Sequence, residues 1–278
     1  ARLGIAAQSV GISQAAYNEG LAYARDREQF GKAIINFPAV YDMLALMKAK
    51  LDAGRALLYQ CARYVDIYKA LDDIARERKL TPEERKEQKT FAKLADSLTP
   101  LAKGMNSEYC NQNTYDALQI HGGSGFMMDY PIQRYYRDAR ITSIYEGTTQ
   151  LQVVAAIRYV TNGSYLQQMR EFEAAELSAE MQPLQARAKQ MADKFEEAVA
   201  YVKEAADPCF HDLCARHLVE MAADVIMLHL LLHNASCNAE MFGKSARVYA
   251  NFVEAEVAKH HTFVMNLKPA DLDDYRQA

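Results

Sequence analysis

The chain has 278 residues, with 32 Lys and Arg against 36 Asp and Glu, which gives a formal net charge of -4. It contains 12 Gly and 7 Pro, both below the roughly 7% and 5% of an average protein. So few turn-forming residues exclude a β-sandwich, a propeller or a collagen-like chain and favour long helices. Half of the residues are apolar, which is enough for a real core, and the length fits one large or two small domains.

The net charge and the cysteine content indicate which classes of partner and which cellular compartment to expect. A slightly acidic chain lacks the basic excess of nucleic-acid binders, and we expect no nucleic-acid partner. The five cysteines are odd in number and scattered, which argues against a disulfide framework and favours a reducing, cytoplasmic compartment. No run reaches the roughly 18 apolar residues of a membrane span, and the richest run, residues 225–232, is typical of a buried core helix.

The first part of the chain predicts two helices. Residues 1–25 are rich in alanine with larger apolar residues at intervals, and the polar run 25–29 marks the end of this buried helix. Pro38 suits the first turn of a second helix. Apolar residues then recur at steps of three, four or seven up to Val65, which is strong helical periodicity.

A charged hairpin tip and a third long helix follow. Most residues between positions 72 and 89 are charged, and their signs alternate. Within this run, Thr-Pro-Glu-Glu at 81–84 combines an N-cap, a proline at the first helical position and acids in the first turn. The pattern predicts a solvated tip between two helices, the second of which runs to about Gln119.

The second half begins with a loop. Residues 121–130 hold three of the 12 glycines. Pro131 opens a short helix, and Thr148 or Thr149 is a suitable N-cap for the helix that ends near residue 160. The sequence Asn162-Gly163-Ser164 is a C-cap and a candidate domain boundary. Beyond it, helices are predicted over residues 184–202, 208–232 and 246–264.

These elements predict an all-α fold, with an antiparallel four-helix bundle over residues 1–163 and a second, smaller helical domain over residues 164–278. No stretch alternates long enough to require a strand. Cysteines and histidines gather near residue 210, and histidines again near residue 230, but the paired C-x-x-C spacing of zinc sites is absent. We therefore expect no metal site.

The first of three loops suited to chemistry is Arg27-Glu28-Gln29-Phe30-Gly31. An arginine beside exposed amides and a glycine can hold a phosphate. The alternative is a helix end with a solvated salt bridge, and this motif alone favours that alternative.

The second loop covers residues 119–126, with the sequence QIHGGSGF. Its glycines let the backbone approach a ligand closely. It is not a Rossmann fingerprint, because no strand precedes it and Met128 holds the third glycine position. An ordinary turn between helices is an equal alternative.

The third loop is Tyr-Glu-Gly-Thr at residues 145–148. A carboxylate just before a glycine and a helix N-terminus can be aimed into a cleft and act as a general base. The alternative is an acid that stabilises a helix start, which the motif alone favours.

Taken together and in this order, the three motifs resemble the C-terminal helical domain of the acyl-CoA dehydrogenases. They are R-x-QFGK at 27–32, QIHGG-x-G at 119–125 and RDA-x-I-x-x-IYEGT-x-Q at 137–150. The resemblance covers roughly residues 1–161, and three motifs in order at family-like separations are highly specific. The extension over residues 164–278 resembles the extra helical domain of larger family members.

The resemblance implies FAD-dependent oxidation of an acyl-CoA thioester to the trans-2-enoyl-CoA. In the family, a carboxylate removes a proton from Cα while hydride leaves Cβ for flavin N5, and hydrogen bonds to the thioester carbonyl stabilise the enolate-like charge. Glu146 matches the catalytic glutamate, and Gly147 matches a residue that contacts the substrate through its backbone. The residues that match FAD contacts are Arg27, Gln29, Phe30, Gln119, Gly123, Thr148 and Gln150. One subdivision of the family places the base just before an arginine matching Arg2, where this chain has Ala1, and this supports Glu146.

The resemblance also implies partners. Arg27 and Gln29 match residues that reach the FAD of the neighbouring subunit, with Phe30 packing there, so we expect a homodimer or homotetramer. Acyl-CoA is the expected substrate, and an electron-transfer flavoprotein is the expected acceptor. The family carries two further domains ahead of this region. We therefore expect the chain to be the C-terminal part of a larger enzyme, with weak or no FAD binding and no turnover alone.

Two alternatives stay open. An acyl-CoA oxidase shares the architecture but passes its electrons to oxygen. A non-catalytic helical assembly module would use the glycine loop and the charged tip as interface elements, but it has no reason to keep Glu146 in order with the other two motifs.

Overall fold

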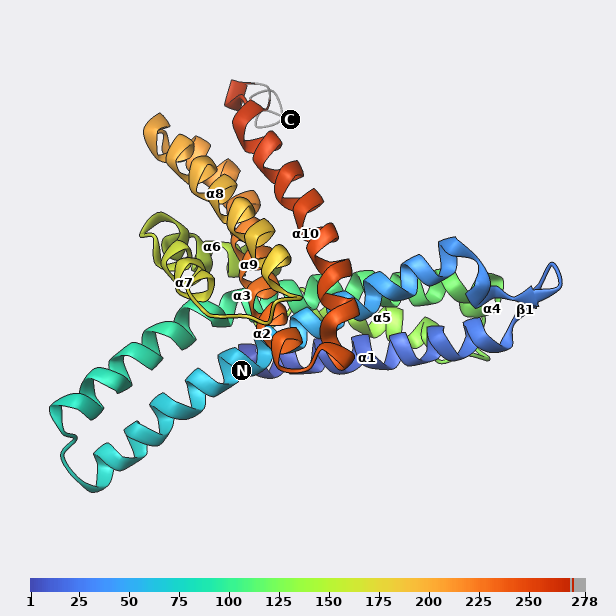
Figure 1. Ribbon diagram of the computed structural model, residues 1–278, viewed down its shortest axis with the longest axis horizontal. Helices are drawn as coiled ribbons and strands as arrows, with labels where there is room; N and C mark the ends of the chain where they lie inside the picture. The colour runs from blue at the N-terminus through green and yellow to red at the C-terminus, as the bar shows by residue number, and fades with distance from the viewer. Residues whose placement is uncertain (271, 273–278) are drawn as a thin grey trace. The chain divides into compact units, whose positions relative to one another are not determined.

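The computed structural model describes residues 1–270 and residue 272. Within these residues the regular secondary structure is helical apart from one short hairpin, as Figure 1 shows, and the chain divides into two compact units, Ala1–Gln152 and Val153–Ala278. The predicted all-α fold is confirmed. The division falls inside one helix, and the boundary predicted after residue 163 stays a prediction.

Unit 1 is a helical bundle. Its elements are α1 (Arg2–Asp26), β1 (Glu28–Gln29), β2 (Lys32–Ala33), a 3-10 turn (Ile34–Asn36), α2 (Pro38–Glu77), α3 (Pro82–His121), α4 (Gly123–Phe126), α5 (Ile132–Thr142) and the start of α6 (Thr149–Thr161). Helix α3 packs against α1, α2 and α5, and α1 packs against α2 and α5 as well. Small and aliphatic side chains from all four helices fill one core, including Ala16, Ala24, Leu44, Met47, Ala117, Ile120 and Ile132.

The long helices of unit 1 begin and end where local signals predict. Helix α2 starts at Pro38, and α3 starts after a capping box in which Thr81 Oγ1 accepts from the Glu84 amide at 3.1 Å and Glu84 Oε2 accepts from the Thr81 amide at 2.9 Å. Arg78 also pairs with Glu84 at 2.6 Å, and the pKa of Glu84 is lowered to about 2, first by that hydrogen bond. Figure 1 shows α2 and α3 side by side out to this exposed tip, which confirms the predicted hairpin.

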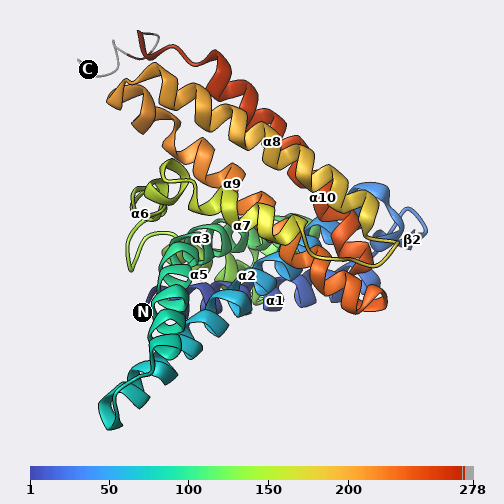
Figure 2. The same ribbon diagram turned by 60° about the vertical axis from the view of Figure 1, so that its left-hand side comes forward.

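Unit 2 packs around its most apolar helix. Its complete helices are α7 (Ser164–Glu173), α8 (Gln182–Ala205), α9 (Pro208–Cys237) and α10 (Ala239–Asn266). Helix α9 contacts the other three, and Figure 2 shows α8 beside α10. The sequence analysis missed α7, and it began the last helix seven residues late. Helix α10 starts at Ala239 because the Asn238 side chain accepts from the Met241 amide at 3.0 Å and caps it.

Helix α9 meets the length and hydropathy of a membrane span, contrary to the expectation that no segment would. Its most apolar 18-residue window has a mean hydropathy of 1.3, but 83% of that window is buried inside the protein. All residues from Val225 to Leu232 are buried, as predicted for a core helix. The helix is apolar because it forms the centre of unit 2.

Candidate functional site

The first motif forms a tight hairpin after α1. Gln29 pairs with Lys32, which leaves Phe30 and Gly31 as a two-residue loop with φ of 51° and 78°. Two positive φ angles suit the twist of a short hairpin, but they are unusual for a bulky residue such as Phe. The Phe30 side chain is 93% exposed and makes only an edge contact with Phe37 among the described rings, at 6.3 Å. Strained backbone positions of this kind cluster at ligand-binding and catalytic sites.

The hairpin and the glycine loop line one pocket of about 540 Å³. The hairpin contributes Arg27, Gln29 and Phe30, and the loop contributes Gly122, Gly123 and Ser124. The rest of the lining is largely apolar and comes from α1, α2, the 3-10 turn and the end of α3. Gln119 is exposed on the last turn of α3 but is not part of this lining. Two of the three motifs therefore meet at one place.

A buried histidine is among the residues that line this pocket. His121 stacks on Tyr23 at 4.3 Å between ring centroids, and burial lowers its pKa. Its Nδ1 lies 2.7 Å from the Ala117 carbonyl oxygen, so Nδ1 carries the proton and donates. Nε2 is then a buried acceptor without a partner in the described residues. Gly125 is required beside it, because a Cβ there would lie 2.6 Å from His121 Cβ.

The third motif is a left-handed turn between α5 and α6. Glu146 and Gly147 have φ of 55° and 91°. The Gly147 carbonyl oxygen accepts from Lys103 Nζ at 2.6 Å and from Gln152 Nε2 at 3.0 Å. The φ of 91° favours glycine at position 147, and a Cβ there would also push Gln152 Nε2, 2.8 Å away, out of its hydrogen bond. The Glu146 side chain is exposed, and the backbone that carries it is held by the side chains of Lys103 and Gln152.

The start of α6 completes this turn. Thr148 Oγ1 accepts from the Leu151 amide at 3.3 Å, which confirms Thr148 as the predicted N-cap. Thr149 donates its hydroxyl to Glu108 of α3. Thr148 and Gln150 are exposed.

The sequence analysis missed Lys103 and Gln152. Both are buried, with 0% and 4% of their surface exposed, and neither belongs to a motif. Burial lowers the pKa of Lys103, while the charges of Glu108 and Glu146 act in the opposite direction. The only sequence signal was a lysine within the otherwise apolar and small run 101–105 of a buried helix.

The pocket and the Glu146 turn lie at different places along α3. His121 lines the pocket, and Lys103 holds the turn. They are 18 residues apart (103 to 121) in one continuous helix, or about 27 Å at 1.5 Å per residue. The structure therefore brings Arg27, Gln29, Phe30 and Gly123 together but not with Glu146.

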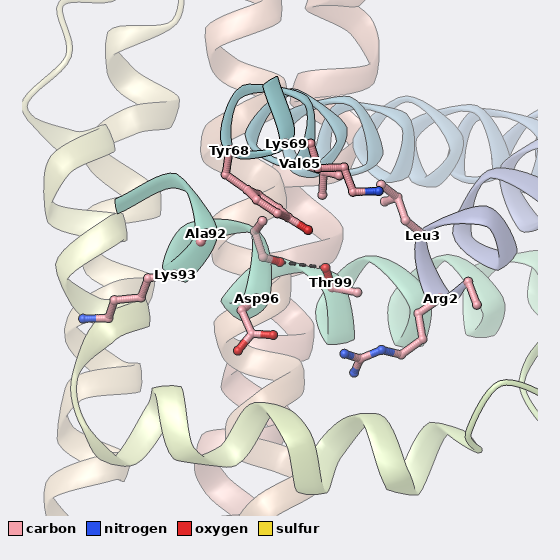
Figure 3. A pocket seen from close by; sticks show the side chains of 11 residues that line it. Arg2, Leu3, Val65, Tyr68, Lys69, Ala92, Lys93, Asp96 and Thr99 are labelled. Atoms are coloured by element: carbon pink, nitrogen blue, oxygen red, sulfur yellow. Dashed lines mark hydrogen bonds between the residues drawn. The ribbon is translucent and has the colours of Figure 1, made fainter. Parts of the chain in front are cut away.

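A larger pocket of about 730 Å³ lies where α1 begins, between α2 and α3. Figure 3 shows Tyr68 of α2 on one side, Asp96 and Thr99 of α3 on another, and Arg2 of α1. Thr99 Oγ1 donates to a carbonyl oxygen of its own helix at 2.6 Å. None of the predicted site residues lines this pocket, and the side chain of Ala1, which does line it, has no group that can take a proton.

The histidines and cysteines of unit 2 form no metal-binding group. In the ranges that the structure describes, no three His, Cys, Asp or Glu side chains gather closely enough to hold an ion. His217 instead contacts His260 of α10 through their Nδ1 atoms at 2.8 Å. The pKa of His217 is lowered to about 4, mainly by burial and then by the charge of His260.

Comparison with known protein families agrees with this architecture. Residues 1–159 match the family described as "Acyl-CoA dehydrogenase, C-terminal domain", and residues 161–272 match "Acyl-CoA dehydrogenase C terminal". The chain therefore belongs to the acyl-CoA dehydrogenase family and consists of its C-terminal helical domains.

Named relatives match a little over half of this chain. The caffeyl-CoA reductase-Etf complex subunit CarC of Acetobacterium woodii is 39% identical over 151 residues, which are 54% of this chain and 34% of that protein. The 3-(aryl)acrylate reductase of Clostridium sporogenes is 38% identical over 151 residues, with the same two shares. The short-chain specific acyl-CoA dehydrogenase of Megasphaera elsdenii is 34% identical over 165 residues, 59% of this chain and 36% of that protein. The chain thus spans about a third of the length of these relatives.

A solved structure matches nearly the whole chain. The acyl-CoA dehydrogenase from Bacillus anthracis, complexed with FAD, superposes with a TM-score of 0.74 at 20% identity. The match covers 95% of this chain and 48% of that one. At this identity the likeness shows the fold.

Proposed function

We propose that this chain is the C-terminal part of an FAD-dependent acyl-CoA dehydrogenase that oxidises an acyl-CoA to the trans-2-enoyl-CoA, with Glu146 as the base that removes the α proton. The observation that carries the proposal is the Glu146 turn. An exposed carboxylate stands on two left-handed residues whose carbonyl groups are held by buried side chains. Such strain persists only where the surroundings fix it, and an assembly module has no need of it.

The residues of unit 1 fit FAD at two places. Around the 540 Å³ pocket, the Arg27 cation, the exposed glycine backbone and the unpartnered His121 Nε2 offer what a phosphate-bearing cofactor needs. Gln29, Phe30, Gln119 and Gly123 would complete that contact. Thr148 and Gln150, beside the Glu146 turn, would hold the flavin that takes the hydride of the same reaction.

The separation of these two places supports shared cofactors. The pocket and the turn are about 27 Å apart along α3, so each would serve a different FAD. A homodimer or homotetramer would satisfy both, with the Arg27 pocket reaching the cofactor of the neighbouring subunit. The exposed Phe30 would be covered in that contact.

The turn's own groups define the chemistry. The Glu146 carboxylate takes the α proton, and backbone N–H groups such as that of Gly147 stabilise the charge that develops on the thioester oxygen. The isolated chain would bind FAD weakly or not at all and would not turn over, because it carries only part of the site. The length of the relatives supports this view.

We propose two domains, residues 1–163 and 164–278. Gly163 has a φ of 79° directly before α7, and this left-handed conformation separates α6 from α7. The two family matches meet between residues 159 and 161, close to that position.

Five free cysteines, three of them buried, fit a reducing cytoplasm.

The reverse reaction is the second candidate. Two relatives carry the names of reductases, one of them in an Etf complex. The same base and the same cofactor would then deliver a proton and a hydride to an enoyl-CoA. An electron-transfer flavoprotein is the proposed redox partner in either direction.

The longer protein that contains this chain allows a direct test. Its flavin should bleach anaerobically on addition of a saturated acyl-CoA, and re-oxidise with an electron-transfer flavoprotein faster than with oxygen. Re-oxidation of the reduced flavin by an enoyl-CoA, without bleaching by the acyl-CoA, would favour the reductase. Fast oxygen uptake would favour an acyl-CoA oxidase, and no response to any CoA thioester would contradict the proposal.

A further inference from the structure

Beneath the Glu146 turn, two buried donors face its backbone. Lys103 of α3 is fully buried, and its ammonium group lies 2.6 Å from the Gly147 carbonyl oxygen. Gln152 of α6 donates to the same oxygen at 3.0 Å and lies 3.4 Å from the Glu146 carbonyl oxygen. Both carbonyl groups of the turn therefore point into the bundle.

The backbone N–H groups of the turn point in the opposite direction, away from the bundle. In a trans peptide the C=O and the next N–H point in opposite directions, and the chain has no cis bond in its described part. The N–H groups of Gly147 and Thr148 therefore point away from Lys103 and Gln152. The Glu146 side chain, which is exposed, is carried by the same stretch of backbone.

Burying the ammonium group of Lys103 costs free energy, which a structural or functional role must offset. An ammonium group loses much of its hydration in such a place, which is why burial lowers the pKa of Lys103. Glu108, one turn further along α3, accepts from the Thr149 hydroxyl and anchors the next residues of the loop. Gly104 of α3 faces the Gln152 side chain, and a Cβ added there would lie in ordinary contact with Gln152 Cβ at 3.5 Å. Three side chains therefore bond to the turn or to Thr149 just after it: Lys103 and Glu108 of α3 and Gln152 of α6.

We propose that Lys103 is the positioning residue for the catalytic base, and that its bond to Gly147 O holds the turn in the left-handed conformation that presents Glu146 and the two amides to the substrate. The inference rests on the proposed function of Glu146. Without this bond the turn would relax toward ordinary φ angles, and the carboxylate would lose its aim. A displacement of about 1 Å can cost roughly 100-fold in rate.

The experiment uses the longer holoenzyme with three variants. Lys103→Met removes the donor at similar volume. Lys50→Met is the matched control, because Lys50 is also buried, at 5% exposure, but donates to Gln112 at 2.6 Å and not to the carbonyl groups of the turn. Glu146→Gln tests the proposed function itself. Flavin reduction by acyl-CoA is measured in rapid mixing, and reduction by dithionite, which needs no base, is measured beside it.

For Lys103→Met we expect flavin reduction by acyl-CoA to slow by about 100-fold with FAD retained, dithionite reduction unchanged and enoyl-CoA affinity within about threefold. Amide hydrogen exchange over residues 145–149 should rise by about tenfold, which is a readout independent of turnover. Lys103→Arg, which keeps a cationic donor, should recover part of the rate. In Lys50→Met, both the rate in the folded enzyme and the exchange over 145–149 should equal those of the wild type.

The outcomes separate the two claims. If Glu146→Gln reduces its flavin normally, the proposed function fails and this inference fails with it. If Glu146→Gln is inactive while Lys103→Met has the wild-type rate and exchange, only the inference is overturned. Should Lys103→Met not fold, Lys103→Gln, whose shorter and uncharged side chain replaces the ammonium donor, takes its place, and a wild-type rate with wild-type exchange over 145–149 in that variant would overturn the inference equally.

Discussion

The two units of this protein use their buried and paired polar groups differently. In unit 1, Lys103 and Gln152 hold the backbone of a loop, and two bulky residues, Phe30 and Glu146, are kept at positive φ. In unit 2, polar side chains pair with one another: Arg170 contacts Glu173, Asp193 and Glu196. The one non-glycine residue at positive φ in its described part, Ala206, ends α8. Unit 1 is built to present loops, whereas unit 2 is built as a closed scaffold.

The relatives point the same way. Those named above match 151 to 165 residues of this chain, a length close to that of unit 1. The three sequence motifs also lie in unit 1. If function resides there, changes at the three motifs of unit 1 should alter chemistry and cofactor binding, and changes in unit 2 should alter stability alone.

The largest effect is expected at Glu146. In the longer protein, Glu146→Gln should slow acyl-CoA-driven flavin reduction by about 10²–10⁴-fold, because the amide cannot take the α proton. Its FAD content should stay at the wild-type level. The measurement is the rate of bleaching in anaerobic rapid mixing. A matched change in unit 2, Glu254→Gln, breaks an exposed pair with Arg187 and should leave the rate unchanged.

The second effect is a pH dependence that arises in unit 2. Burial, followed by the charge of Arg170, lowers the pKa of His229 to about 4, against about 6.5 in an unfolded chain. As pH falls from 6.5 to 4, the unfolded state takes up a proton that the folded state refuses. The free energy of unfolding should therefore be unaffected above pH 6.5 and fall below it, by at most about 3 kcal/mol from this residue.

Calorimetry of the chain at pH 7 and pH 4.5 checks this prediction. His229→Leu should remove a share of the loss between these two pH values, because leucine has no proton to take up. His217, whose pKa is also lowered to about 4, should account for part of the remainder. An unchanged pH dependence in His229→Leu would contradict the prediction.

A third effect sharpens the comparison through cofactor affinity. Arg27→Ala in the longer protein should weaken FAD binding by about 10- to 150-fold, because a charged hydrogen bond contributes roughly 1.5–3 kcal/mol. Phe30→Ala should weaken it as well, by exposing the cofactor. Arg187→Ala in unit 2 is the control. Fluorescence titration of the apoprotein with FAD gives the affinities, and equal values for Arg27→Ala and Arg187→Ala would count against the proposed FAD site.

The smallest effect concerns the tip of unit 1. Thr81→Ala removes the capping hydrogen bond of α3 and should lower the free energy of unfolding by about 1 kcal/mol. Thr90→Ala removes an exposed hydroxyl that bonds to a carbonyl of its own helix, and should change it by less than about 0.5 kcal/mol. Urea unfolding followed by circular dichroism measures both. Neither variant should change flavin reduction, since the tip is remote from the Glu146 turn along α3.

Much of the fold could be predicted because its signals are local. Pro38 and the Thr81 capping box mark helix starts within a few residues of themselves, and the structure has both helices starting there. Helix α7 escaped prediction because it is only 10 residues long and offers few turns of periodicity. The start of α10 depends on a single cap, at Asn238, which the apolar pattern does not reveal.

The site was predictable only in part, for a similar reason. Glu146 and Arg27 lie in motifs that can be read along the chain. Lys103 lies 44 residues from Gly147, and only the packing of α3 beneath the turn brings them together. The distance between the Arg27 pocket and the Glu146 turn is likewise a property of α3, which is continuous between Lys103 and His121. A one-dimensional pattern contains neither.

The most direct test of the account asks whether Glu146 exchanges the α proton. The longer holoenzyme would be incubated in deuterium oxide with an acyl-CoA analogue that cannot lose hydride from its β carbon, and deuterium at the α carbon would be followed by mass spectrometry. We predict steady incorporation by the wild-type enzyme and none above background by Glu146→Gln. Incorporation by Glu146→Gln at the wild-type rate would show that another group is the base.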